Sequence, residues 1–87
     1  MRFQGAVITE QGVTFGVLIV KQHILDDPTM RDALVLEGSR LFDGIPTVLM
    51  AQDFNGTPTY YGRSDISEFM ASVPLEAVPW KEYTVSI

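Results

Sequence analysis

The 87-residue chain contains no cysteine. Disulfides, thiolate nucleophiles, dithiol redox chemistry and cysteine-held zinc or iron–sulfur sites are therefore excluded. The chain also lacks any apolar run near the roughly 20 residues that a membrane-spanning helix requires, and no signal peptide is visible. We expect a cytoplasmic protein with no membrane partner.

Positive charge is scarce, because six lysines and arginines stand against eleven acidic residues and give a net charge of −5. The basic residues are scattered along the chain, which disfavours binding to nucleic-acid phosphates or anionic lipids. Glycine-rich phosphate-binding motifs are missing as well. The sequence therefore predicts no nucleic-acid partner, and it identifies no cofactor.

Apolar residues are plentiful, at 46% of the chain. A chain of this length suits one hydrophobic core, so residues 1–87 are expected to form a single α+β domain. Period-2 and period-3.6 patterns predict the order β-β-α-β-β-α-β, a mixed five-stranded sheet with two helices. The expected strands are residues 2–8, 13–21, 47–52, 57–61 and 80–87, and the expected helices are residues 28–42 and 64–73.

The strand at residues 13–21 is apolar on both faces, which is typical of a central strand covered on both sides. A strand, a helix and a strand in one sheet imply a right-handed crossover, so this strand should run parallel to residues 47–52. Asp27 followed by Pro28 predicts the start of the first helix, and Ser64 is predicted to cap the second.

Asn55 and Gly56 predict a two-residue type I′ hairpin turn, which places Phe54 opposite Thr57. Pro58 lacks a backbone donor, so the strand that follows the turn is predicted to lie at an edge of the sheet.

His23, the only histidine, lies beyond the carboxyl end of the strand at residues 13–21, where open α/β sheets hold their ligands. With Asp26 and Asp27 it could form a general base or part of a metal site, although a loop histidine beside a helix cap explains the same residues. Arg63 could hold an anion at the second helix, or it is a solvated side chain beside a cap. No catalytic residue and no metal ligand is assigned.

Four aromatic residues are candidate partner contacts. Adjacent strand residues face opposite sides, so one of Tyr60 and Tyr61 should pack inward and the other should be exposed. Phe54 lies at a turn, and Trp80 lies on the polar face of the last strand or folds back under residues 74–79. Single-stranded nucleic acid stacks on such aromatics, but it normally also requires a basic groove, which is lacking here.

The segment Gly44-Ile45-Pro46-Thr47, an apolar strand, Asn55-Gly56, a short strand, and Gly62 with a helix bearing Ile66, Phe69 and Met70 resembles the closing half of thioredoxins and glutaredoxins. The resemblance covers about a third of the chain. It implies a cis Ile45–Pro46 peptide bond beside a substrate-binding surface. The family's Cys-x-x-Cys motif is absent, and a hairpin replaces its opening strand–helix pair, so redox activity is excluded.

These observations favour a small non-catalytic protein–protein interaction module, which forms a homodimer or binds another protein. The expected contact is an apolar sheet face or an edge strand, because two short helices placed on one face would leave the other face uncovered. The alternative is a small-molecule-binding protein or an enzyme with a cleft near His23, Asp26 and Asp27.

Overall fold

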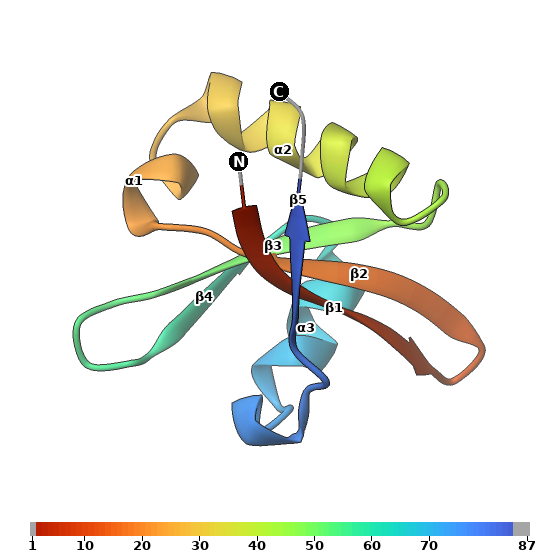
Figure 1. Cartoon of the computed structure of the whole chain (residues 1–87). Helices are drawn as coiled ribbons and strands as arrows, with labels where there is room; N and C mark the ends of the chain where they lie inside the picture. The colour runs from red at the N-terminus through yellow and green to blue at the C-terminus, as the bar shows by residue number, and fades with distance from the viewer. Residues whose placement is uncertain (1, 85–87) are drawn as a thin grey trace.

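The computed structural model describes residues 2–84, which form a mixed five-stranded sheet between two helical layers (Figure 1). Along the chain, the elements are β1 (Arg2–Glu10), β2 (Val13–Ile19), α1 (Gln22–Leu25), α2 (Pro28–Leu41), β3 (Thr47–Gln52), β4 (Pro58–Tyr61), α3 (Ser64–Ala71), the 3-10 turn η1 (Leu75–Ala77) and β5 (Lys81–Thr84). The predicted α+β architecture and order are confirmed, and the short helices α1 and η1 are additional. The predicted end of the last strand, residues 85–87, lies outside the described residues.

The strand order in the sheet is β4-β3-β2-β1-β5. β2 and β3 are parallel, with Gly16 opposite Thr47, and the other three pairs are antiparallel. The predictions that the strand beginning at Val13 is central and that the strand beginning at Pro58 is an edge are both confirmed. The parallel pair is joined through α2, as the crossover argument requires.

The two long helices lie on opposite faces of the sheet (Figure 1). The expected arrangement, in which both helices lie on one face and leave the other face uncovered, is therefore wrong. The chain leaves β4 at one edge and returns to β5 at the other, so α3 and η1 cross the face that α2 does not cover. Each face has its own buried core, with Leu18, Leu34 and Leu49 under α2, and Val17, Val48 and Met70 under α3.

The predicted type I′ turn at Asn55-Gly56 is wrong by one residue in register. Gln52 pairs with Pro58 and the Asp53 amide donates to the Thr57 carbonyl at 3.1 Å, so residues 54–56 form a three-residue loop in which Gly56, but not Asn55, adopts positive φ. The Asp53 carboxylate accepts hydrogen bonds from the Asn55 and Thr57 amides at 2.8 and 3.0 Å. This side chain satisfies the turn amides locally, which a two-residue turn would not require.

A two-residue turn does occur at the other hairpin. Gln11 and Gly12 have φ values of 50° and 79°, and the flanking residues Glu10 and Val13 face each other. Positive φ at both central residues is the signature of a type I′ turn. β1 is consequently longer than predicted and continues to Glu10.

Local signals at the helix ends were correct in one case of two. The Asp27 carboxylate accepts a hydrogen bond from the Met30 amide at 3.2 Å, which confirms the predicted cap of α2. Ser64 is instead the first residue of α3, and Arg63 holds the cap position without a side-chain cap bond. The Arg63 guanidinium pairs with the Asp65 carboxylate in the first turn, where a negative charge is favourable.

The cis Ile45–Pro46 bond implied by the resemblance to thioredoxins is wrong, because no peptide bond in residues 2–84 is cis. Pro46 serves the sheet instead, since its carbonyl accepts the Gly16 amide at 2.8 Å. Within residues 2–84, none of the helices has the length and apolar character needed to cross a membrane.

Candidate functional site

The sequence-predicted cluster around His23 is only partly assembled. His23 lines a hollow of about 440 Å³ beyond the carboxyl end of β2, but Asp26 and Asp27 do not line it. Asp26 accepts a side-chain hydrogen bond from Gln22 at 3.4 Å, and Asp27 caps α2. The described residues that line the hollow are Arg2, Phe3, Gln4, Ile19, Val20, Lys21, His23 and Ile24.

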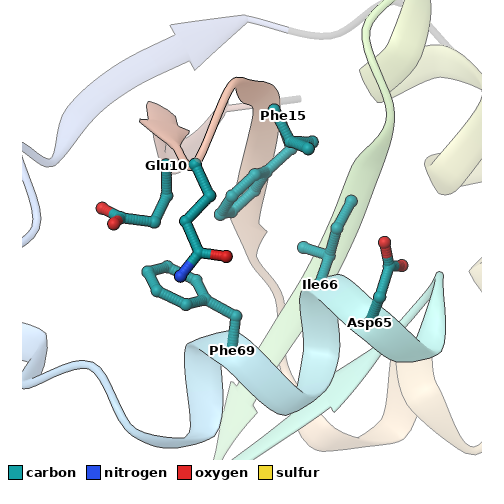
Figure 2. Close-up of a pocket in the computed structure, with 7 residues that line it drawn as sticks. Glu10, Phe15, Asp65, Ile66 and Phe69 are labelled. Carbon is teal, nitrogen blue, oxygen red and sulfur yellow. The ribbon is translucent and has the colours of Figure 1, made fainter.

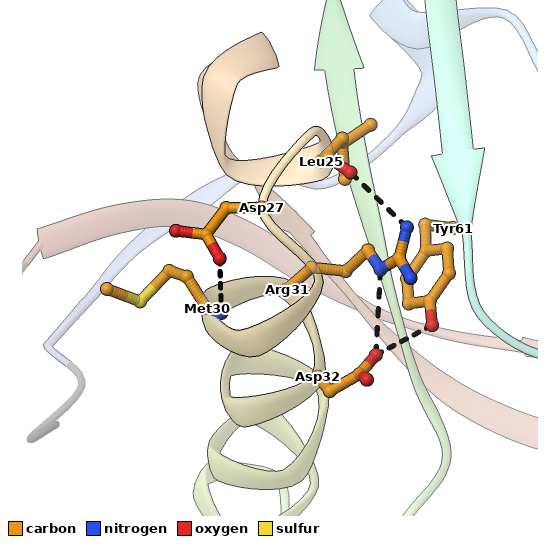
Figure 3. A network of polar contacts seen from close by, with 6 residues as sticks. All are labelled: Leu25, Asp27, Met30, Arg31, Asp32 and Tyr61. Carbon is orange, nitrogen blue, oxygen red and sulfur yellow. Dashed lines mark hydrogen bonds and ion pairs between the residues drawn. The ribbon is translucent and has the colours of Figure 1, made fainter.

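Tyr61 belongs to a polar network that connects β4 to α2 (Figure 3). Its hydroxyl donates to the Asp32 carboxylate at 2.7 Å, and the Arg31 guanidinium lies 4.3 Å from the centre of its ring. Arg31 Nη1 also donates to the Leu25 carbonyl at 3.4 Å. The network therefore explains Tyr61 as a structural residue of an otherwise exposed edge strand.

The hydrogen bond to Asp32 raises the pKa of Tyr61, because a neutral phenol can donate to the carboxylate and a phenolate cannot. A folded-state pKa above the unfolded value of about 10 stabilises the fold below that pH, and the contribution is lost as pH rises through the folded pKa. We therefore expect Tyr61→Phe to be less stable than wild type at pH 7–9, with the difference shrinking above about pH 10. Urea unfolding at several pH values measures this.

Asp32→Asn supplies the control, because it keeps a hydrogen-bond acceptor for the tyrosine but removes the negative charge. In that background, the pH at which stability declines should move down toward the ordinary titration range of tyrosine. A difference between wild type and Tyr61→Phe that is independent of pH up to pH 11 would contradict the assignment of this network.

Tyr60 packs against the opposite layer, in the core beneath α3. Its hydroxyl is buried without a hydrogen-bond partner in the described part of the chain, and burial raises the pKa of Tyr60. Both tyrosines are half-buried, so the expectation that one of them would be exposed is wrong. Because they lie on opposite faces of one strand, they do not form a shared stacking platform.

Trp80 folds back under residues 74–79, which confirms the second of the two positions expected for it. Its indole Nε1 donates to the Leu75 carbonyl at 3.0 Å, and the ring packs against the core beneath α3. Phe54 is the opposite case, because it is 98% exposed at the tip of the β3–β4 hairpin. Of the four aromatic candidates, only Phe54 presents a fully accessible ring.

Arg63 donates two hydrogen bonds to Asp65, at 3.1 and 2.7 Å. These bonds lower the pKa of the Asp65 carboxyl, and the ion pair occupies the guanidinium edge that an anion would need. Arg63 also borders a shallow hollow of about 340 Å³ between α2 and the start of β3, near the exposed Leu36.

A smaller hollow of about 170 Å³ lies between the β1–β2 turn and α3 (Figure 2). Phe15 and Phe69 meet edge to face at 6.0 Å on its floor, and Glu10 and Asp65 lie at its rim. This hollow was not predicted from the sequence, because no local pattern indicates that a β-turn will face a helix some fifty residues later.

The outer edge of β1 is the feature of the sheet that sequence analysis missed. β5 pairs with β1 only from Arg2 to Gly5, so residues 6–10 pair with β2 on one side and have no strand on their other side in the described part of the chain. The Gly16 amide donates to Pro46, directly before β3, and the Val20 amide, directly after β2, donates to Met50 of β3. Even-numbered residues of β2 therefore direct their backbone groups toward β3, and odd-numbered residues direct theirs toward β1.

It follows that the β1 partners of those odd-numbered residues, Ala6, Ile8 and Glu10, use their backbone groups to bond β2. The alternate residues Val7 and Thr9 then direct their N–H and C=O groups away from the sheet. The Val7 side chain is 42% exposed beside them. Four backbone groups are thus available for pairing on an edge of high β-propensity.

In residues 2–84, histidine and carboxylate side chains nowhere gather in threes in a way that would hold a metal ion. Two features therefore stand out from the geometry, the basic hollow at His23 and the unpaired edge of β1. Comparisons with protein-family models, curated proteins and solved structures each return no match.

Proposed function

We propose that the protein is a small interaction module that forms a homodimer through the outer edge of β1. Cores on both faces of the sheet leave the apolar-face version of this idea without support. The observation that carries the edge version is the pair of outward-facing residues Val7 and Thr9, which lie beyond the end of the β1–β5 ladder.

The open segment is complementary to itself. Two β1 strands can pair antiparallel about a two-fold axis at Ile8. Val7 of each copy then faces Thr9 of the other copy, so the N–H and C=O groups of both residues are all hydrogen-bonded. The two Ile8 side chains then meet on the α3 face as a non-hydrogen-bonded pair, the closer kind of cross-strand contact. The result is one continuous sheet across both copies.

The strand edges are protected differently, which favours residues 6–10 of β1 as the pairing edge. β5, the strand at that end of the sheet, carries Lys81, and residues 6–10 of β1 lie beyond its ladder. β4 begins with Pro58, which cannot donate a hydrogen bond from its backbone. Residues 6–10 contain neither proline nor lysine, the residues that commonly block edge pairing. Each copy carries a net charge of −5, so association should strengthen as salt screens the repulsion.

Val7→Pro tests the proposal. The Val7 N–H makes no bond to β2, so proline should leave the monomer folded while it removes one donor per copy and adds a ring at the interface. We expect wild type to sediment as a dimer at high micromolar concentration and Val7→Pro to sediment as a monomer. In wild type, exchange of the Val7 and Thr9 amides should slow as protein concentration rises.

Val7→Lys and Val13→Lys form a matched pair that separates edge blocking from added charge. Both valines are exposed on the same hairpin, at 42% and 37%. Val13, however, pairs with Glu10 of β1, so its backbone lies inside the sheet and not on the open outer edge. Only the change at Val7 should weaken the dimer, by about tenfold or more, which corresponds to about 1.4 kcal/mol. A wild-type monomer at high micromolar concentration and moderate salt would refute the homodimer.

An enzymatic role near His23 has no comparable support. Within residues 2–84, no hydrogen bond or ion pair joins His23 to a carboxylate, and Asp27 is engaged in capping α2. A general base normally depends on such an orienting partner.

A further inference from the structure

The hollow beside His23 has a lining of unusual charge for this chain. Among residues 2–84, its ionisable lining residues are Arg2, Lys21 and His23, and none of these described lining residues is a carboxylate. The chain carries only six lysines and arginines against eleven acidic residues, yet two of those six, and the single histidine, border one hollow. In an acidic protein, this gathers basic side chains at one place, with Glu82 paired to Arg2 beside them.

The walls of the hollow are apolar. Phe3 and Ile24 come from the core beneath α2, and Ile19 comes from the core on the opposite face. The volume of about 440 Å³ is within the range of small-molecule sites. The position, outside the carboxyl end of a strand in the sheet's only described parallel pair, is where open α/β sheets bind ligands.

The cations at the rim are accessible. The Arg2 guanidinium lies 3.7 Å from the Glu82 carboxylate, but these side chains are 77% and 61% exposed, so the pair is weak and can be exchanged for a ligand. No ion pair to Lys21 is found among residues 2–84. Binding an anion here would relieve the repulsion between the clustered positive charges.

We propose that this hollow binds a small amphipathic organic anion, a monocarboxylate with a short apolar chain. The carboxylate lies between Arg2 and Lys21, within reach of His23, and the apolar chain lies against Phe3, Ile19 and Ile24. The hollow contains no glycine-rich loop, so it lacks the set of backbone amides that usually surrounds a phosphate.

Titration of the ¹⁵N-labelled full chain with octanoate tests the proposal. Amide shifts should saturate at residues 2–4 and 19–24 and not at Phe15 or Phe69, which line the hollow of Figure 2. Octanol, which lacks the charge, and inorganic phosphate, which lacks the chain, should each bind about tenfold more weakly, because each provides only part of the interaction.

Lys21→Glu should weaken octanoate binding roughly fivefold, as expected for loss and reversal of one exposed charge, and Arg2→Glu with Lys21→Glu should weaken it further. Lys81→Glu makes the same charge change on β5, at a residue that does not line the hollow, and should leave binding within about twofold of wild type, because an exposed charge without contact to the ligand is screened.

Three results would overturn the assignment: no saturable shifts at millimolar octanoate, equal losses in Lys21→Glu and Lys81→Glu, or phosphate binding as tight as octanoate binding. The site is separate from the dimer edge, so Val7→Pro should bind octanoate as wild type does. Failure of the homodimer and failure of the anion site are thereby distinguishable.

Discussion

Leu34→Ala is expected to lower the free energy of unfolding by about 2–5 kcal/mol, because it removes buried methyl groups and leaves a cavity. Leu34 lies in α2, is 0% exposed, and packs in the core between the helix and the sheet. In a domain of this size, the loss is a large share of the total stability.

The same helix provides a matched control. Leu36 is 54% exposed, so Leu36→Ala makes the same chemical change and the same gain in helix propensity with little loss of buried area. The free energy of unfolding of Leu36→Ala should be within about 0.5 kcal/mol of that of wild type. Urea unfolding followed by circular dichroism measures both. Similar losses for the two variants would contradict the described orientation of α2.

Gly16→Ala is expected to destabilise the fold by about 1–3 kcal/mol, although alanine is ordinarily the better strand residue. A Cβ atom at Gly16 would lie 2.2 and 2.5 Å from two ring carbons of Phe42. The ring cannot easily move away, because its other side meets Tyr83 edge to face at 5.0 Å. The glycine therefore makes space for an aromatic side chain at the end of α2.

A double-mutant cycle with Phe42→Val isolates this steric effect. Once the ring is gone, Gly16→Ala should become neutral or slightly stabilising, so the two substitutions should be strongly non-additive. Equilibrium unfolding of the four proteins provides the coupling free energy. Additive effects, or a neutral Gly16→Ala in the wild-type background, would show that Phe42 does not lie over Gly16.

The fold was predictable where the signal is local. The apolar run at β2 identified a central strand, Pro58 identified an edge, and Asp27 identified a helix start, because each reflects the chemistry of neighbouring residues. The type I′ turn predicted at Asn55 is wrong, because the prediction considered only the Asn-Gly dipeptide. The nearby Asp53 carboxylate satisfies the turn amides and favours a three-residue loop, which the dipeptide alone does not indicate.

The candidate sites depended on long-range arrangement, which explains the mixed outcome. His23 was expected beyond the carboxyl end of β2 and lies there in the short helix α1, but its basic neighbour Arg2 comes from the other side of the hairpin and was not expected. The open edge of β1 depends on where β5 stops pairing with it, and neither this end point nor the strand order could be predicted from local sequence patterns. The contact between Tyr61 and Asp32 was not predicted, because the two residues are 29 positions apart in the sequence.

The pairing of β1 with β5 joins the first and last described strands, Arg2 opposite Thr84. Closing so long a loop carries the largest entropic cost in the sheet, so this ladder should form late in folding. While the chain is being synthesised, β1 has its whole outer edge free until β5 leaves the ribosome. A newly made copy therefore offers neighbouring copies a longer β-edge than the finished protein does.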